Sequence, residues 1–473
     1  MAPSPSNRPK VASRLAALAL GAVGLLLAAC GGPVSLVAPP VPHRGTLAPG
    51  LLADPAGTTA SATAADGLLA VASALAPVAA SAADQPAPVA SGTRSSGSGP
   101  DPVPDPFYQP PSPLPPAPPG TLIRSEPIPV GPGLPAGTTA YRVLYHSESL
   151  TGTDVAVSGT VVVPGGPAPA TGRPIVSWAH GTTGIAGSCA PSLQGVGSIP
   201  YLAKLLAMGA IVAATDYAGL GAPGLDPYLV GLSEARTVLD AARAARALPG
   251  TDASDAVVVL GYSQGGQAAL FAGQIAPTYA PDLFLTGEIS LAPVANVTEL
   301  FPPTLGNTPD PLAVYAFMTA VNWSSVYGTY PLSQVLTPQA IALAPAVDQV
   351  CASTLSTAFA GLAADKVFLP TWRRDRPLQR LAELNDAGGT PTRAPILVAQ
   401  GSADPLVPAP STAALVDGRL CGTDHDTVDY VVFPGADHGT VVQRAESTVV
   451  EWISARLAGE PAGASCTISV APS

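Results

Sequence analysis

The sequence predicts an α/β fold, in which helices cover both faces of a mostly parallel central sheet. The prediction rests on two patterns that begin near residue 121. Short apolar segments rich in Val, Ile and Thr recur there, and longer segments with apolar residues at every third or fourth position stand between them. The first pattern is typical of buried strands and the second of helices. Strands and helices that alternate at this spacing form β-α-β units, which build a parallel sheet.

The individual elements are expected in the following places. A β-hairpin rich in Val, Thr and Tyr leads at 140–146 and 154–164. Further strands are expected at 174–179, 211–215, 256–260, 283–291, 396–399 and 428–433. Helices are expected at 199–208, 232–248 and 441–457, and Pro249-Gly250 marks the end of the second.

Residues 293–375 interrupt this alternation. The segment carries helix-like stretches at 310–321 and 339–363 and no clear long strand. In open α/β sheets, ligands bind beyond the carboxyl ends of the strands, and an insertion at this point of the chain should lie there. We therefore expect a mainly helical cap at about 293–375, above an active site.

The N-terminus has the features of an export signal. Residues 1–14 contain three basic residues and no acidic one, and an apolar, glycine-containing run fills 15–29. This pattern is typical of a secretory signal peptide, and the run is too short for a permanent membrane span. The ending Leu-Ala-Ala-Cys resembles the bacterial lipobox, in which Cys30 is acylated and begins the mature protein. An ordinary signal peptide at 1–30 is the alternative.

A disordered linker is expected at 31–120. It consists mainly of Ala, Pro, Ser, Thr and Gly, and 101–119 contains ten prolines in nineteen residues. Such a composition buries too little apolar surface to offset the entropy of the chain. The proline-dense end should be extended and stiff, and would hold a catalytic domain at 121–473 away from a membrane that carries the acylated Cys30.

Charge and cysteine content exclude several other classes of site. The net charge of −11 and the lack of a basic cluster argue against nucleic-acid binding, because phosphate neutralisation supplies most of that affinity. Besides Cys30, the cysteines are Cys189, Cys351, Cys421 and Cys466. An even number in an exported chain indicates two disulfides. None has C-x-x-C spacing, so no zinc or other metal is expected.

The most informative motif is Gly261-Tyr262-Ser263-Gln264-Gly265, between an expected strand and a helix-like segment. G-x-S-x-G at a strand-to-helix turn is the nucleophile elbow of α/β-hydrolases, so we expect that fold with Ser263 as nucleophile. The turn is so sharp that side chains two positions before and after the serine would collide with the neighbouring strand and helix. Glycine avoids both collisions. A glycine-rich turn without chemistry is the alternative.

A serine nucleophile needs a general base, and five histidines are available. His43 lies in the expected linker, His146 in the leading hairpin and His425 in an Asp-rich stretch typical of an exposed loop. His180 belongs to a different motif. His438 follows the last expected strand and precedes the last helix, which is the place of the base in the order Ser, Asp, His. We therefore expect His438 to be the base.

The base in turn needs a carboxylate that orients its ring. Asp404 follows the strand at 396–399 and should emerge at the same sheet edge as Ser263 and His438. Its carboxylate would accept the Nδ1 proton of His438 and leave Nε2 facing the serine. Asp437 is the rival by proximity in sequence. A residue adjacent to His438 is poorly placed to bond its ring, so a structural role is expected for Asp437.

An oxyanion hole needs two fixed N–H donors. The amide of Gln264, at a helix N-terminus, is expected to be one. The other should come from the turn after 174–179, where Thr182 is preferred and Gly181 is the close alternative. His180 is expected to shape this turn. Residues 216–221 also follow a strand at this edge, and we expect them to form a wall of the site rather than a simple turn.

Taken together, these motifs resemble those of the secretory lipase family. The similarity covers about 121–466, and the matching pieces are 177–182, 189–192, 216–221, 261–266, 401–404 and 437–438. The resemblance implies an α/β-hydrolase with a mainly helical cap that acts on carboxylic esters. It also implies the disulfides Cys189–Cys351, between core and cap, and Cys421–Cys466, between the last units. The lipobox and long linker depart from secreted members.

The sequence thus predicts a serine carboxylic-ester hydrolase, a lipase or esterase, that cleaves a small-molecule or lipid ester through an acyl-enzyme without a cofactor. We expect it to be exported and attached to the bacterial cell envelope by Cys30, with secretion as the alternative. The same triad could instead transfer the acyl group to an alcohol, or cleave a peptide. A non-catalytic envelope lipoprotein that binds lipids is the third interpretation.

Overall fold

The computed structural model describes residues 103, 105–301, 306, 308, 310–463 and 466–472. The predicted signal segment, the predicted lipidation site Cys30 and most of the predicted linker lie outside the described residues.

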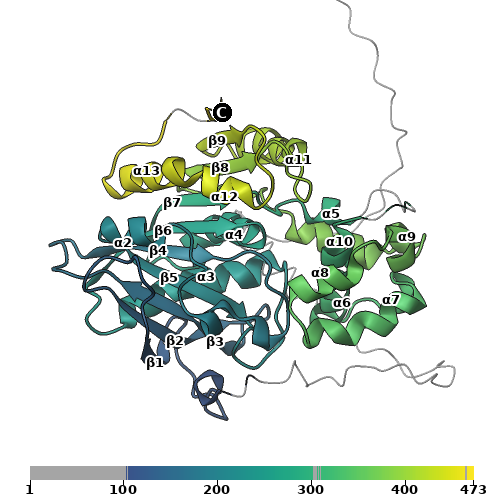
Figure 1. The fold of residues 1–473 in the computed structure, drawn as a ribbon, viewed down its shortest axis with the longest axis horizontal. Coiled ribbons are helices and arrows are strands. Elements are labelled where there is room, and N and C mark those ends of the chain that lie inside the picture. Colours follow the sequence, from purple (N-terminus) through teal and green to yellow (C-terminus); the bar gives the residue numbers. More distant parts are fainter. Residues whose placement is uncertain are drawn as a thin grey trace, which may run out of the picture. The chain divides into compact units, whose positions relative to one another are not determined.

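The described strands form one sheet (Figure 1), ordered β1-β2-β3-β5-β4-β6-β7-β8-β9-β10. The pairs β1–β2, β2–β3 and β3–β5 are antiparallel, and every pair from β5 through β4 to β10 is parallel. All the expected strands are present, and β1 and β10 are additional. The strands are β1 (Leu122–Ile128), β2 (Thr139–Glu148), β3 (Asp154–Val163), β4 (Arg173–Ala179), β5 (Ile211–Ala218), β6 (Ala253–Tyr262), β7 (Phe284–Leu291), β8 (Ile396–Gly401), β9 (Val428–Phe433) and β10 (Thr467–Val470).

Helices cover both faces of the sheet, as predicted. Val257 and Val259 of β6 belong to a core that includes residues of α3 and α4, whereas Val258 and Leu260 belong to a core with α2, α12 and α13. Alternate side chains of a strand point to opposite faces, so β6 is buried from both sides. These helices are α2 (Leu202–Ala207), α3 (Gly231–Ala247), α4 (Gln264–Tyr279), α11 (Ala409–Ala414), α12 (Thr440–Arg444) and α13 (Glu446–Leu457).

The segment between β7 and β8, residues 292–395, is here called the helical insertion. Its described residues form helices and turns, with one isolated antiparallel bridge between Leu336 and Phe368. It has its own apolar core, in which Phe317, Trp323 and Phe368 are fully buried. The helical content agrees with the prediction, but the last helix lies beyond the predicted end at 375. The helices are α5 (Val297–Leu300), α6 (Ala313–Tyr327), α7 (Pro338–Leu343), α8 (Ala352–Phe359), α9 (Ala364–Val367) and α10 (Arg376–Asn385).

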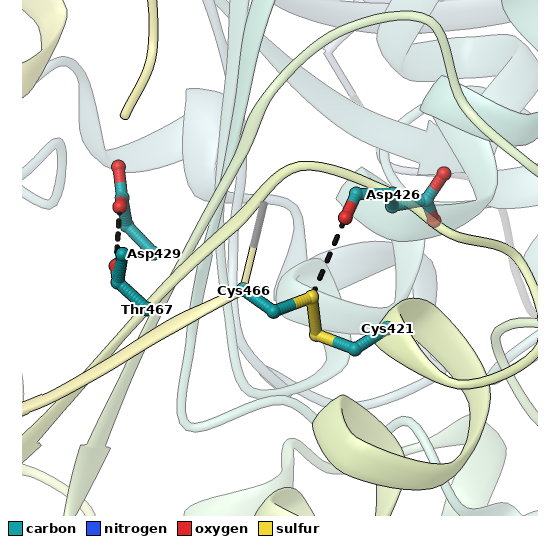
Figure 2. The surroundings of a disulfide bond; sticks show 5 residues. All are labelled: Cys421, Asp426, Asp429, Cys466 and Thr467. Atoms are coloured by element: carbon teal, nitrogen blue, oxygen red, sulfur yellow. Dashed lines mark hydrogen bonds between the residues drawn. A yellow bond between two sulfur atoms is a disulfide. The ribbon is translucent and has the colours of Figure 1, made fainter. Parts of the chain in front are cut away.

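Both disulfides implied by the resemblance are present. Cys189–Cys351 joins the turn after β4 to the residue before α8, and therefore links the sheet to the helical insertion. Cys421–Cys466 closes a separation of 45 residues and joins the segment before β9 to the start of β10 (Figure 2). A cross-link lowers the conformational entropy of the unfolded chain, and more so when it closes a longer loop.

The surroundings of the second disulfide hold the last strand in place. Figure 2 shows Thr467 Oγ1 beside Asp429 of β9, to which it donates a hydrogen bond of 2.6 Å. The backbone of β10 pairs with β9 from Thr467 to Val470. Since the side chains of β10 are exposed, the disulfide and this pairing fix the strand rather than burial.

The end of the predicted linker is packed against the sheet instead of being free. Phe107 and Tyr108 are buried, and the guanidinium carbon of Arg142 lies 4.3 Å from the centre of the Phe107 ring. Arg142 also donates to Asp105 at 2.5 Å, and the Tyr108 hydroxyl lies 2.9 Å from Ser192 Oγ. The predicted boundary at 120 is therefore too late. Proline content suggested disorder, but two aromatic rings and an ion pair stabilise this short stretch.

Candidate active site

Ser263 lies at the turn between β6 and α4, in a backbone conformation that few residues adopt. Its φ is +57°, and its N–H donates to the carbonyl of Leu291 in β7 at 2.8 Å. A Cβ at position 261 would lie 1.8 Å from the Gly265 carbonyl oxygen, and a Cβ at 265 would lie 1.9 Å from the Ala179 carbonyl oxygen. These distances are far below any van der Waals contact. Both glycines are therefore required by the turn, as the sequence predicted.

Ser263, His438 and Asp404 come together from three separate loops. The Ser263 Oγ lies 2.9 Å from His438 Nε2, and His438 Nδ1 lies 2.7 Å from Asp404 Oδ2. Ser263 follows β6, Asp404 follows β8, and His438 lies between β9 and α12. Parallel strands end at the same edge of a sheet, which is why residues 175 positions apart can meet.

The Asp404 carboxylate is buried but fully hydrogen-bonded. Its Oδ1 accepts from the amides of Leu406 at 2.8 Å and Val407 at 2.9 Å. Oδ2 accepts from Gln400 Nε2 at 3.1 Å in addition to the imidazole. These hydrogen bonds fix the orientation of the carboxylate oxygen that faces His438 Nδ1.

The rival carboxylate and the other described histidines lie in different surroundings. Asp437 Oδ1 accepts from the Thr440 amide at 2.8 Å and from its hydroxyl at 2.6 Å, so it closes the turn that begins α12. His146 Nδ1 lies 2.8 Å from Asp154, within the leading hairpin, and His425 is exposed. Among the described residues, the side chain hydrogen-bonded to Ser263 Oγ is that of His438 and none of these. The fifth histidine, His43, lies outside the described residues.

The turn after β4 lies against the nucleophile. A Cβ at Gly181 would lie 3.5 Å from the Ser263 Cβ and 2.9 Å from the Tyr262 ring. His180 Nδ1 lies 2.7 Å from the Gly181 carbonyl, and burial lowers the pKa of this imidazole, so the neutral ring donates there. In a trans peptide the C=O and the following N–H point in opposite directions. The Thr182 N–H therefore points away from the His180 ring, which makes His180 a shaping residue.

Asp216 and the residues after it do not line the cavity, so the wall expected at 216–221 is absent. Asp216 is fully buried, and it accepts from Ser158 Oγ at 2.6 Å and from the Ser192 amide at 2.9 Å. Burial raises the pKa of Asp216 to about 6. The carboxyl group thus ties β5 to β3 and to the segment after β4, and the residues that follow turn the chain.

A cavity of about 1380 Å³ opens at Ser263 and His438. Its lining includes Gly181 and Thr182 from the turn after β4, and Tyr228 from the segment before α3. The helical insertion adds a group of mostly apolar side chains: Leu300, Phe301, Leu312, Tyr315, Trp372, Leu378 and Ala382. The predicted site therefore lies in a concave and largely apolar cavity of the described residues, as ligand sites usually do.

Two tyrosines of this region were not singled out by their sequence. The Tyr228 hydroxyl lies 2.9 Å from Thr182 Oγ1. Tyr262 donates to the His438 carbonyl at 3.0 Å, and its ring centre lies 5.1 Å from the imidazole. Tyr262 belongs to the elbow motif. The motif indicates that Tyr262 lies beside the nucleophile, but not that its hydroxyl bonds the His438 carbonyl. No local pattern marks Tyr228, because its contact with Thr182 spans 46 residues.

Among the residues that the structure describes, no group of three or more His, Cys, Asp or Glu side chains is arranged to hold a metal ion. In the same part of the chain, no helix has the length and apolar character that a bilayer span requires.

The chain is similar to members of one known protein family. Residues 197–465 match the family model described as secretory lipase, which is more than half of the chain. The chain belongs to the secretory lipase family. Among relatives, a probable inactive lipase, MT1628 of Mycobacterium tuberculosis (strain CDC 1551 / Oshkosh), is 27% identical over 388 residues, or 76% of this chain and 82% of that protein. Lipase A of Moesziomyces aphidis is 28% identical over 201 residues, or 40% of this chain and 42% of that protein.

Solved structures establish the fold of this secretory lipase family member. Candida antarctica lipase A superposes with a TM-score of 0.67 and 20% identity, over 78% of this chain and 89% of that one. The rice cell wall degrading esterase LipA of Xanthomonas oryzae gives a TM-score of 0.61 and 20% identity, over 73% and 100% of the two chains. The predicted α/β-hydrolase fold is therefore confirmed. The name of the mycobacterial relative shows that family membership alone does not establish activity.

Proposed function

We propose that the protein is a serine carboxylic-ester hydrolase, a lipase or esterase, that acts through Ser263, His438 and Asp404. The observation that carries the proposal is the continuous pair of contacts, 2.9 Å from Ser263 Oγ to His438 Nε2 and 2.7 Å from His438 Nδ1 to Asp404 Oδ2. Nucleophile, base and orienting carboxylate within hydrogen-bond reach of one another are the requirements for acyl transfer to serine.

The proposed reaction has two steps. His438 Nε2 takes the proton of Ser263 as Oγ attacks the ester carbonyl, and returns it to the leaving alcohol when the carbon–oxygen bond breaks. Water then attacks the acyl-enzyme with the same base. The amides of Gln264 and Thr182 would stabilise the negative oxygen in both steps, because Gln264 begins α4 and Thr182 lies in the turn beside Ser263.

The substrate class follows from the lining of the cavity. Aromatic and aliphatic side chains from the helical insertion face the same space as Ser263, and they suit the acyl chain of an ester or acylglycerol. A volume of about 1380 Å³ exceeds the range of about 300–1,000 Å³ for ordinary small-molecule pockets, which favours a long or branched substrate.

Replacement of Ser263 tests the assignment. Ser263→Ala should lower the kcat for p-nitrophenyl esters by about 10⁶-fold, as loss of a serine nucleophile does elsewhere, and leave thermal unfolding unchanged. Ser411 also lines the cavity but has no histidine partner in the described residues, so Ser411→Ala is the matched control and should keep kcat within about threefold. Activity near wild type in Ser263→Ala would refute the proposal. Wild-type protein that fails to react with a fluorophosphonate would support an inactive, lipid-binding role instead.

Export and anchoring form a separate proposal. The description of the family as secretory supports export, and acylation of Cys30 would retain the domain at the cell envelope. Metabolic labelling with a radioactive fatty acid tests this, because Cys30→Ala should lose the label and the envelope-bound fraction together. Equal labelling of both forms would exclude Cys30 as the anchor.

A further inference from the structure

Glu234 is a buried carboxyl group beneath the candidate active site. It lies in the first turn of α3 and is 1% exposed, and it forms no ion pair among the described residues. Its Oε1 accepts two hydrogen bonds, one of 2.7 Å from Gln264 Nε2 and one of 2.8 Å from the Leu229 amide. Neither the reaction proposed above nor the packing of α3 explains why these two donors converge on one oxygen.

The two bonds reach both sides of the proposed oxyanion hole. Gln264 directly follows the nucleophile and would supply one donor through its own amide. Leu229 directly follows Tyr228, whose hydroxyl lies 2.9 Å from Oγ1 of Thr182, the residue that would supply the other donor. Glu234 therefore connects the two segments that would carry the donors of the hole.

Each of the two segments that Glu234 contacts contains a residue with a strained backbone. Ser263 has a φ of +57° and Leu229 a φ of +54°, and residues other than glycine seldom adopt such values. Strained conformations persist only where the surroundings over-determine them. Removing the shared acceptor would release one restraint on each strained segment, so the N–H groups of the hole would lose their fixed direction.

The placement of this carboxyl group carries a folding cost. Burial raises the pKa of Glu234 to about 8, and within the described residues its Oε2 has no hydrogen-bond partner. An apolar side chain of similar size would avoid this penalty, since buried polar atoms without partners are destabilising. The acceptor at Oε1 is the feature that a leucine could not supply.

We propose that Glu234 is a positioning residue that holds Gln264 and the Tyr228-Leu229 segment, and through them both donors of the oxyanion hole. This inference rests on the proposed ester hydrolysis at Ser263. It predicts that an acceptor at this position matters more for turnover than for substrate binding, because the oxyanion forms only along the reaction path.

Two substitutions in the full-length protein separate the acceptor from the carboxyl group. Glu234→Leu removes the acceptor, and we expect kcat for p-nitrophenyl esters to fall about 10- to 100-fold with KM within about threefold, less than the roughly 100- to 1,000-fold cost of removing a donor outright. Glu234→Gln keeps an oxygen acceptor and should retain at least about a third of the wild-type kcat. The control is Glu288→Leu, because Glu288 is fully buried in β7, contacts Thr392 and does not line the cavity.

A second variant covers the case in which Glu234→Leu does not fold. Gln264→Met removes the side-chain donor of the same hydrogen bond and keeps the backbone N–H at position 264. It should therefore reproduce the loss in kcat. Wild-type kcat in folded Glu234→Leu or in Gln264→Met would overturn the inference, and so would an equal loss in Glu234→Gln and Glu234→Leu. Full activity in Ser263→Ala would instead remove the proposed function itself, which distinguishes the two failures.

Discussion

The nucleophile and the base of the candidate site are held in place by different means. Ser263 is fixed by backbone geometry, since it sits between β6 and α4 with a φ of +57° and between two glycines that leave no room for a side chain. His438 lies in a loop and is fixed by side chains. Asp404 bonds its ring, and Tyr262 bonds its carbonyl.

This difference predicts different responses to substitution. A residue held by backbone contacts has no freedom to adapt, so a single added methyl group near it must displace strands or helices. A residue held by hydrogen bonds loses them one at a time, and each loss is worth about 1 kcal/mol. Substitutions around Ser263 should therefore act on folding, whereas substitutions around His438 should act on turnover.

The largest effect on stability is expected at the elbow. In Gly265→Ala the added Cβ would lie 1.9 Å from the Ala179 carbonyl oxygen, so β4 and α4 must separate. We expect a loss of at least about 3 kcal/mol in the free energy of unfolding, at the upper end of overpacking penalties, and a loss of ester hydrolysis of more than about 100-fold. Thermal unfolding and kcat measure the two effects.

A glycine beside the base provides the matched control. In Gly439→Ala the nearest atom to the added Cβ is 3.9 Å away, and the position has a helical φ of −80°. Unfolding should change by less than about 0.5 kcal/mol. If Gly265→Ala unfolds at the same temperature as Gly439→Ala, the nucleophile is not held more rigidly by its backbone than the base is.

The next effect is expected at the carboxylate that orients His438. Asp404→Asn keeps an oxygen that can accept from the Leu406 and Val407 amides, so the loop should stay folded. The amide would present N–H to His438 Nδ1 and favour the tautomer in which Nε2 cannot take the serine proton. We expect kcat to fall by about 10⁴-fold, as in other triads, without a change in thermal unfolding.

The control is Asp437→Asn, which alters an exposed carboxylate bonded to Thr440. Its kcat should stay within about threefold of wild type. Equal losses of kcat in the two variants would show that Asp404 is not the carboxylate that orients His438.

The parallel part of the fold and the contacts among Ser263, His438 and Asp404 could be predicted from sequence because each signal is local. Buried strands give continuous apolar runs, and Ser263, Asp404 and His438 each follow one. β1 was missed because Pro127 interrupts its pattern, and proline is tolerated there since β1 is an edge strand. β10 was missed because four residues are too few to show a period. The expected helix at 339–363 is divided into α7 and α8, with Pro345 between them.

Contacts between distant segments could not be predicted. Glu234 occupies a polar position in a helical pattern, and sequence alone gives no reason to place it beside Gln264, thirty residues away. The docking of Phe107 and Tyr108 depends on Arg142, which lies in another element. Local patterns report the conformation of a segment, whereas these roles arise from which segments the fold brings together.

The smallest effect is expected from a single hydrogen bond to the base loop, and two tyrosines allow it to be isolated. Tyr262 donates to the carbonyl of His438 at 3.0 Å, and Tyr201 donates to the carbonyl of Val442, four residues later in α12. Each phenylalanine variant should lose about 1 kcal/mol of folding free energy. If His438 is positioned by its own carbonyl contact, Tyr262→Phe should also lower kcat about threefold to tenfold at unchanged KM, because up to about 1.4 kcal/mol would be lost from the transition state. Tyr201→Phe should leave kcat within about twofold. If both variants slow turnover equally, the bond stabilises α12 as a whole, and the base is not held at His438 itself.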